Sequence, residues 1–288
     1  MIEWETLNAE GNSLYRQGRY DRAVVVAKKA LAVAEEAVGR DHPAVATSLN
    51  NLASLYNAQG QYAQAEPLYK RSLAINEKAY DSNHPDVATD LNNLASLYHT
   101  QGQYAQAEPL YKRSLAIWEK ALGPEHPDVA VSLNNLAALY DAQGQYAQAE
   151  PIDKSSLAID EKALGPEHPA VATSLNNLAE LYRQGRYDRA VVVAKKALAV
   201  AEEALGLEHP DVAVSLTHLA ELYRTQGQYA QADPLYKRSL AIREKALGPE
   251  HPAVATSLES MAALFRNINR EKEAGALEKR AAAIRAIK

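Results

Sequence analysis

One segment of about 42 residues returns along the whole chain. The dipeptide His-Pro marks its period, at successive intervals of 42, 42, 42, 41 and 42 residues. Seven repeats share a common pattern, and each has a leucine at the same place, which we call the lead leucine. The lead leucines are Leu7, Leu49, Leu91, Leu133, Leu175, Leu216 and Leu258. Such a period predicts a repeat architecture, in which one small structural unit is copied in series.

Each repeat has the pattern of two short helices. In the second repeat, Pro43 suits the first position of a helix and Gly60 suits its end. Apolar residues between them fall at helical spacing, namely Leu49, Leu52, Ala53 and Tyr56. A second stripe follows Gly60 and consists of Tyr62, Ala65, Tyr69 and Leu73.

A single helix pair buries too little apolar area to be stable, whereas stacked pairs bury their stripes against one another. The sequence therefore predicts an all-α fold, an α-solenoid of about seven helix pairs and about fourteen helices. We expect one domain over residues 1–288, with repeats at approximately 4–40, 43–82, 85–124, 127–166, 169–207, 210–249 and 252–288.

The same residues resemble the tetratricopeptide repeat (TPR). Its signature is, in order along the chain, a large apolar residue, a small residue, Tyr, Gly, Tyr, Ala and an aromatic residue. The second repeat has Leu49, Ala53, Tyr56, Gly60, Tyr62, Ala65 and Tyr69 at these positions. The 42-residue period and the segments HPDVA, NNLA and AEPLYKRSLAI are similar to the long subtype of kinesin light chains and many bacterial TPR proteins. The resemblance implies a right-handed superhelix whose first helices line a concave groove.

Composition argues against several classes of function. The net charge is −5, so a nucleic-acid partner is not expected. The absence of cysteine excludes disulfides and thiolate chemistry. The sequence has neither a signal-peptide pattern nor an apolar run long enough for a membrane span, which favours a soluble protein in the cytoplasm without membrane contact.

Motifs for catalysis and for metal or cofactor binding are missing. The chain has no GxGxxG, GxxxxGK[ST], GxSxG or HExxH pattern. Six of the eight histidines precede the repeated prolines, where they suit the start of a helix, and equivalent positions in successive repeats lie too far apart to share one metal ion. We therefore expect no enzyme, no cofactor and no metal site.

The expected function is binding of a protein or peptide. Four positions on each first helix, one, five, eight and nine residues after the lead leucine, should face the groove. The candidate peptide-binding residues are Asn50, Ser54, Asn57, Asn92, Ser96, His99, Asn134, Asp141, Asn176, Glu180, Arg183, Glu221 and Arg224.

Two alternatives stay open within this set. The Asn50, Asn92, Asn134 and Asn176 series suits the backbone of an extended peptide, because a carboxamide both donates and accepts hydrogen bonds. These carboxamides could instead bridge neighbouring helices, a role that we expect for Asn51, Asn93, Asn135 and Asn177. The pairs Glu180/Arg183 and Glu221/Arg224 form either a charged ligand site or ion pairs along one helix.

The sequence thus predicts a non-catalytic scaffold that binds an extended peptide or a helix of a partner in its groove. The alternatives are a ligand-sensing regulatory module and a structural, self-assembling repeat protein. Self-association is a hypothesis for the N-terminal edge, where Trp4 either folds back over the first repeat or meets another chain.

The interval of 41 residues predicts a local change in repeat five. Its second half, from Leu181 to Gly206, repeats Leu14 to Gly39 with one substitution. Because a lost residue turns a helix by about 100°, a loss before Tyr182 would misplace the apolar stripe. We expect a shorter first helix or a tighter turn between Tyr182 and Tyr187. In repeat four, Asp153 replaces a tyrosine, which makes this repeat the expected weak joint.

Overall fold

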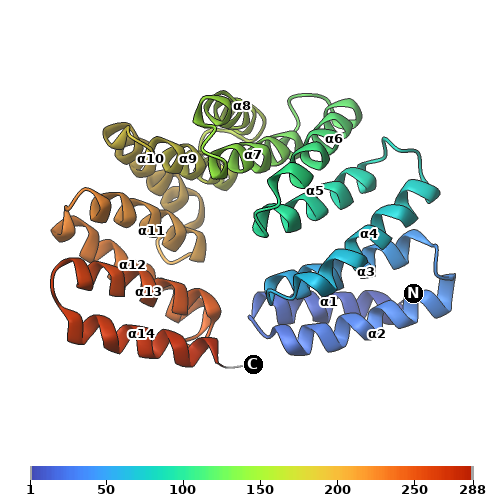
Figure 1. The fold of residues 1–288 in the computed structure, drawn as a ribbon, viewed down its shortest axis with the longest axis horizontal. Helices are drawn as coiled ribbons and strands as arrows, with labels where there is room; N and C mark the ends of the chain where they lie inside the picture. The colour runs from blue at the N-terminus through green and yellow to red at the C-terminus, as the bar shows by residue number, and fades with distance from the viewer. Residues whose placement is uncertain (1, 287–288) are drawn as a thin grey trace. The chain divides into compact units, whose positions relative to one another are not determined.

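The computed structural model describes residues 2–286, which form fourteen α-helices and no strands (Figure 1). This confirms the predicted all-α fold with two helices per repeat; residues 1, 287 and 288, at the ends of the predicted domain, lie outside the described part. The helices group into two compact units, Met1–Gln145 and Tyr146–Lys288. Each unit is described by itself below, and the single domain stays a prediction.

The first unit holds three complete helix pairs and the first helix of the fourth. Each first helix packs against its own second helix, and that helix packs against the first helix of the next repeat. The seven helices are α1 (Ile2–Arg16), α2 (Tyr20–Val38), α3 (Pro43–Ala58), α4 (Tyr62–Ala79), α5 (Pro85–Thr100), α6 (Tyr104–Leu122) and α7 (Pro127–Ala142).

The second unit begins with the second helix of repeat four and continues the same order of packing. Its helices are α8 (Tyr146–Leu164), α9 (Pro169–Tyr182), α10 (Tyr187–Leu205), α11 (Pro210–Thr225), α12 (Tyr229–Leu247), α13 (Pro252–Asn267) and α14 (Glu271–Arg285). The boundary between the units thus falls inside repeat four, the repeat that contains the buried Asp153.

The repeated His-Pro dipeptide starts six of the first helices. Proline takes the first helical position, where its missing N–H leaves no bond unmade. The histidine before it caps the helix: Nδ1 of His42 accepts a hydrogen bond from the backbone N–H of Ala44 at 3.1 Å. The other five histidines accept the same bond, which confirms their predicted role at the helix start.

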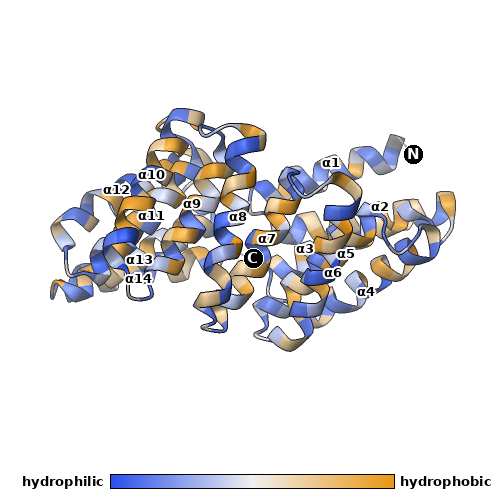
Figure 2. Cartoon of the chain, turned by 90° about the horizontal axis from the view of Figure 1, so that it is seen from above, coloured by the Kyte–Doolittle hydropathy of each residue, from blue (hydrophilic) through white to orange (hydrophobic). Residues whose placement is uncertain are grey.

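The core lies between the two helices of a pair and between successive pairs. Helices carry apolar and polar residues on different sides, as Figure 2 shows by hydropathy. In α3 the whole predicted stripe is buried, from Leu49 to Tyr56. Around α5, Val87, Ala88 and Leu91 pack against Ile117 of α6, with Leu73 of the preceding repeat alongside. The predicted periodicity is therefore the packing pattern.

Polar contacts form both within a repeat and between successive repeats. Ser72 on α4 donates to the carbonyl oxygen of Ala46 on α3 at 2.9 Å, and Ser114 and Ser239 make the equivalent bond in their repeats. The Tyr98 hydroxyl on α5 donates to Glu66 of the previous repeat at 2.9 Å. The serine bonds recur at the repeat period and join the two helices of one repeat, whereas the Tyr98 bond joins one helix pair to the next.

Repeat five differs as its sequence predicts. Helix α9 has 14 residues, whereas α3, α5, α7, α11 and α13 have 16 each. The connection to α10 spans residues 183–186, one residue more than the connection at 59–61. Gly185 in this turn has φ of 104°, compared with 70° for Gly60, a conformation that favours glycine. The lost residue comes from the end of the first helix, and the turn is longer rather than tighter.

Trp4 folds onto its own chain. Its indole N–H donates to the Ser48 hydroxyl of α3 at 2.7 Å, and the ring packs against a cluster that includes Ala34, Val45 and Ile75. This is the first of the two arrangements expected for Trp4. Self-association through the N-terminal edge stays a prediction.

Candidate peptide-binding surface

The predicted groove residues occupy equivalent positions on the first helices of each unit. In unit 1 they lie on α3, α5 and α7, and in unit 2 on α9 and α11, except Arg183, which directly follows the last residue of α9. We number these positions from the lead leucine: position 1 (Asn50, Asn92, Asn134, Asn176), position 5 (Ser54, Ser96, Glu180, Glu221) and position 8 (Asn57, His99, Asp141, Arg183, Arg224).

The position 1 carboxamides take part in bridges between repeats. Asn50 donates to the buried Asp90 of α5 and accepts from Asn93 at 3.3 Å. Asn92 accepts from Asn135 at 2.8 Å. These side chains are half-buried, as is Asn134. The bridging alternative therefore describes Asn50 and Asn92, which leaves less of each carboxamide for a peptide.

Asn176, in unit 2, lies deeper than its counterparts. It is only 6% exposed, and its Nδ2 donates to the Ser215 hydroxyl of α11 at 2.9 Å. Asn176 is therefore not part of an open surface.

The neighbouring carboxamides at position 2 bridge repeats as expected. Asn51 donates to Asn8 at 2.9 Å, Asn93 to Asn50 and Asn135 to Asn92. The same role for Asn177 stays a prediction. We call each of these side-chain amide bonds between adjacent first helices an amide rung.

In repeats two and three, position 5 links the first helix to a tyrosine of the second helix of the same repeat. Ser54 is hydrogen-bonded to the Tyr69 hydroxyl and Ser96 to that of Tyr111. Burial raises the pKa of both tyrosines to about 12, so the hydroxyls stay protonated. In repeat six, Glu221 takes the place of serine, and burial raises the pKa of Tyr236. These serines at position 5 thus help to hold the first helix against the second helix of the same repeat.

Position 8 carries a different chemistry in successive repeats. Asn57, Asp141 and His99 are half-buried. The His99 ring packs against Tyr104 and Tyr111, with ring centroids 5.8 and 6.5 Å away. Burial lowers the pKa of His99, so its ring is neutral near pH 7. In unit 2 the position holds arginine.

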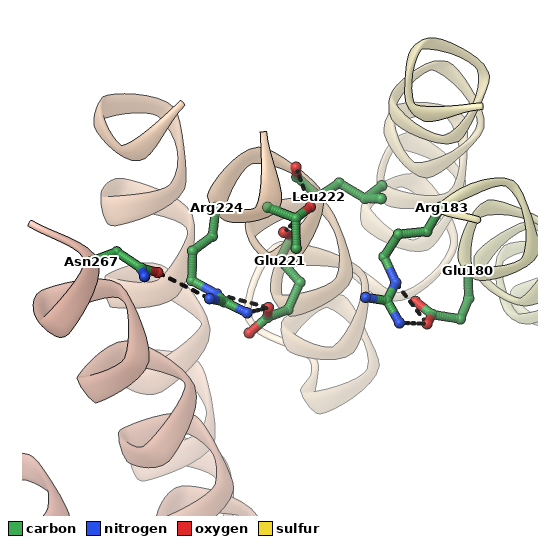
Figure 3. A network of polar contacts seen from close by, with 7 residues as sticks. Glu180, Arg183, Glu221, Leu222, Arg224 and Asn267 are labelled. Carbon is green, nitrogen blue, oxygen red and sulfur yellow. Dashed lines mark hydrogen bonds and ion pairs between the residues drawn. The ribbon is translucent and has the colours of Figure 1, made fainter. Parts of the chain in front are cut away.

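The two arginines form ion pairs along their own helices (Figure 3). Arg183 Nε donates to Glu180 at 2.8 Å on α9. Arg224 holds Glu221 on α11 through Nε at 3.0 Å and Nη2 at 2.8 Å, and its Nη1 reaches Asn267 of α13 at 3.0 Å. The expected neutralisation within each pair is thus present, and Arg224 also connects two repeats.

The last first helix departs from this pattern. Arg266, at position 8 of α13, pairs with Glu278 and Glu271 of α14, and Glu259 at position 1 pairs with Arg285. Glu278 lies 12 residues from Arg266, and Arg285 lies 26 residues from Glu259. Neither pair has the spacing of three or four residues that predicts an ion pair along one helix. The final helix therefore neutralises the charges of its neighbour.

Clusters suited to metal binding or acid–base chemistry do not form around these positions. Within residues 2–286, no three His, Asp or Glu side chains converge as metal ligands. None of the helices in the same range combines the length and the apolar character of a membrane span. The first helices offer hydrogen-bonding and paired charged groups, which are suited to recognising another chain.

Comparisons with known proteins agree with the repeat structure. The family model described as tetratricopeptide repeat matches residues 5–78, 45–120, 86–162, 142–203, 181–245 and 211–286, which together cover most of the chain. A search of curated proteins finds none that matches.

Solved structures include similar repeats. One from Podosopora anserina, described as kinesin light chain nearly identical TPR-like repeats, has 33% identity and a TM-score of 0.57, covering 71% of this chain and 97% of its own. BtubC (BKLC) from P. vanneervenii has 26% identity and a TM-score of 0.60, covering 81% and 92%. The apo form of RapI, at 17% identity and a TM-score of 0.66, covers 98% and 97% and shares the fold alone. These matches confirm the predicted resemblance, and the chain belongs to the tetratricopeptide repeat family.

Proposed function

We propose that this protein is a non-catalytic scaffold that binds an extended peptide or a helix of a partner protein along its first helices. Proteins built from these repeats are typically interaction scaffolds. The observation that carries the proposal is the contrast between two kinds of position on the first helices. Packing positions keep Leu, Ala and Tyr in repeat after repeat, whereas position 8 changes among Asn, His, Asp and Arg.

This contrast has a physical explanation in ligand recognition. Packing fixes the core positions, because a change of even one methylene in a close-packed core is felt. Close packing imposes no single residue type at position 8, whose contacts within the chain differ from repeat to repeat, from ring packing at His99 to an ion pair at Arg224. A partner that meets successive helices does require it, since each helix then recognises a different part of the partner.

Unit 2 supplies the charged part of this surface. Arg183 and Arg224 are partly exposed, with 35% and 24% of each side chain accessible, and each is held by a glutamate of its own helix. A fixed guanidinium loses little freedom on binding, so it suits carbonyl or carboxylate groups of a peptide. We expect peptides that combine acidic and amide side chains to bind here.

A peptide selection tests the proposal. Random peptides displayed on phage are selected against the full chain, and affinities of the enriched peptides are measured by calorimetry. We expect the Arg183→Ala/Arg224→Ala variant to bind them at least tenfold more weakly, about 1.4 kcal/mol. The matched control is Lys70→Ala/Lys112→Ala, which removes two exposed cations from second helices.

The outcomes separate clearly. Weaker binding by the first-helix variant with unchanged binding by the control supports the proposal. Failure to enrich any peptide, or equal affinity of all three proteins for the enriched peptides, contradicts it.

A further inference from the structure

A pocket opens between the first helices of repeats one and two, within unit 1. It has a volume of about 140 Å³ and lies between α1 and α3, with the buried Ala27 of α2 at its base. Asn12, Tyr15 and Ser54 also line the pocket and are exposed, so they form its mouth. These three residues hold positions 5 and 8 of their first helices, which are positions of the candidate peptide-binding surface.

Two small residues distinguish repeat one from the repeats that follow. Gly11, four residues after the lead leucine of α1, corresponds to an alanine in each of the other six repeats. Ala27 of α2 takes the place of a tyrosine, which in repeats two, three and six is Tyr69, Tyr111 and Tyr236. No other repeat combines the two changes. Repeat one therefore has less side-chain volume at this place than any repeat that keeps the tyrosine.

Repeat three shows what occupies the same space when the tyrosine is present. Tyr111 is hydrogen-bonded to Ser96 at position 5, and its ring lies 6.5 Å from that of His99 at position 8. The tyrosine ring thus lies beside positions 5 and 8 of the first helix of its own repeat. In repeat one these positions are Asn12 and Tyr15, and both line the pocket. The pocket is therefore the space that an aromatic ring fills in an equivalent repeat.

The pocket has the size and the walls that suit an aromatic ring. In another protein, an apolar cavity of about 150 Å³ binds benzene. Leu7, Leu55 and Ala27 supply apolar walls. The Tyr15 ring, packed on Tyr20 with ring centroids 5.5 Å apart, adds an aromatic wall at the mouth.

The polar groups of the pocket limit the kind of side chain that enters it. Asn8 and Asn51 form an amide rung at 2.9 Å, so these two carboxamides already bind each other. None of the described lining residues is charged, which favours a neutral side chain. Asn12 is exposed at the mouth, and its carboxamide can donate to and accept from the backbone of a peptide.

The base of the pocket favours phenylalanine over tyrosine. A ring that enters from the mouth points its far edge towards Ala27, whose side chain forms no hydrogen bond. A hydroxyl group on that edge would lose its bond to water without gaining another from Ala27.

We infer that this pocket binds the phenyl ring of a phenylalanine in a peptide that lies along the first helices of unit 1. The ring takes the place of the tyrosine that repeat one lacks, and the carboxamide of Asn12 binds the peptide backbone at the mouth. The peptide rests on the proposed function, whereas the pocket and its two small residues do not.

A fluorinated probe and two variants test the inference on the full chain. The probe is N-acetyl-4-fluorophenylalanine N-methylamide, whose ¹⁹F resonance shifts and broadens when it binds. Ala27→Tyr fills the pocket with the residue that repeats two, three and six carry. Gly11→Ala adds one methyl group; a Cβ on Gly11 would lie 3.9 Å from Cγ1 of Val26, an ordinary contact, so the helix accommodates it.

Ala194→Tyr is the matched control. It makes the same change in α10 of unit 2, whose sequence is that of α2 except for the last residue. Its site is not part of the pocket in unit 1. The control therefore separates the filling of this pocket from the general effect of a tyrosine at that place in a second helix.

We expect saturable binding of the probe to the wild type and to the control, and no binding to Ala27→Tyr. Gly11→Ala should bind about fourfold more weakly, the effect of one methyl group. Because this variant removes a glycine from a helix, its melting temperature should not fall, so weaker binding would not reflect unfolding. Unlabelled N-acetylphenylalanine N-methylamide should displace the probe at about fivefold lower concentration than its leucine counterpart.

Four results overturn the inference. They are the absence of a saturable ¹⁹F change with the wild type, equal displacement by the leucine compound, wild-type binding by either pocket variant, and loss of binding in Ala194→Tyr. Circular dichroism shows whether each variant is folded. If Ala27→Tyr does not fold, Gly11→Ala decides.

The outcome is distinguishable from that of the peptide selection. Probe binding together with a failed selection supports the phenyl pocket and contradicts the proposed scaffold function. Enriched peptides that lack phenylalanine, together with a silent probe, overturn the pocket and leave the scaffold function standing.

Discussion

Asp90 is the residue whose environment differs most from its counterparts. It directly precedes a lead leucine, a place held by Ser48, Ser132, Ser174, Ser215 and Ser257 in other repeats. Its carboxyl is fully buried and accepts hydrogen bonds from Ser72 at 2.8 Å, Asn76 at 2.7 Å and Asn50. Burial raises its pKa from 3.8 to about 6, although the three donors act in the opposite direction.

This raised pKa predicts a loss of stability with rising pH. The folded state holds the proton more tightly than the unfolded state, so the stabilisation is complete below pH 3.8 and is lost as the pH rises through about 6. Asp90→Asn removes this dependence. Relative to the wild type, the variant should gain about 3 kcal/mol in free energy of unfolding between about pH 3.5 and pH 7. Urea titrations at both pH values measure the difference.

Asp128→Asn is the control for this prediction. Asp128 is exposed at the start of α7, so its replacement should leave the pH dependence of the wild type intact. A constant difference between wild type and Asp90→Asn at both pH values would show that the folded and unfolded states bind this proton equally, so that burial does not raise the pKa of Asp90.

Individual roles were predictable where the residue repeats and unpredictable where it is unique. The six histidine caps and the bridges of Asn51, Asn93 and Asn135 follow from a position that recurs. Asn176 Oδ1 and His218 Nδ1 are buried and have no hydrogen-bond partner among the described residues, and no recurring position predicts this, because it depends on a contact that is missing. Position 2 is Asn in repeats two to five and His in repeat six.

At the scale of helices, the contact between one second helix and the next first helix varies in its charge. Asp160 of α8 accepts from Ser174 of α9 at 2.7 Å, whereas Arg243 of α12 donates to Ser257 of α13 at 2.6 Å. Both ionisable groups are buried; burial raises the pKa of Asp160 and lowers that of Arg243. The two contacts are equivalent in geometry and opposite in charge.

The same substitution should therefore have opposite consequences at the two contacts. Ser174→Asp places a second carboxylate beside Asp160, and Ser257→Asp places one beside Arg243. We expect the first variant to be less stable than the second by about 2–3 kcal/mol, because only the second gains a buried partner of opposite charge. Urea unfolding at pH 7 measures both. Equal destabilisation would mean that the added volume, not the charge, determines the cost.

The length of α9 gives a further prediction. Sequence reasoning placed the missing residue between Tyr182 and Tyr187, and the structure shortens α9 while keeping the stripe of α10 in place. One glutamine inserted between Arg183 and Gln184 should extend α9 and change the free energy of unfolding by less than about 1 kcal/mol. The same insertion between Ala197 and Leu198 turns half of the α10 stripe by about 100°.

Circular dichroism during thermal unfolding distinguishes the two insertions. We expect a melting temperature close to the wild type for the first and a loss of several degrees or more for the second. Similar melting temperatures for both would show that the register of α10 is not set by its buried residues, Ala190, Ala194, Ala197 and Ala201 among them.

At the scale of the whole molecule, the period predicts neighbours but not long-range grouping. Within each of the two units, it correctly indicates that each helix packs on the next one along the chain. It does not indicate where the chain divides into two units, because every repeat carries the same period. The boundary lies within repeat four, where Asp153 breaks the tyrosine column, so a local substitution is a better guide to it than the repeat itself.

Because each repeat contacts mainly its neighbours in the sequence, a destabilising substitution should affect mainly the repeats next to it. In a solenoid, stability is approximately a sum of repeat and nearest-neighbour terms, so distant repeats need not unfold together. Leu91→Ala in unit 1 removes a fully buried side chain of α5 and should cost about 2–5 kcal/mol. We expect hydrogen exchange to lose protection in α4, α5 and α6 and to remain as in the wild type in α11–α14. Leu216→Ala in α11, also fully buried, should give the reverse pattern. If either substitution lowers protection equally in both units, the chain unfolds as one cooperative body, and the additive description of its stability fails.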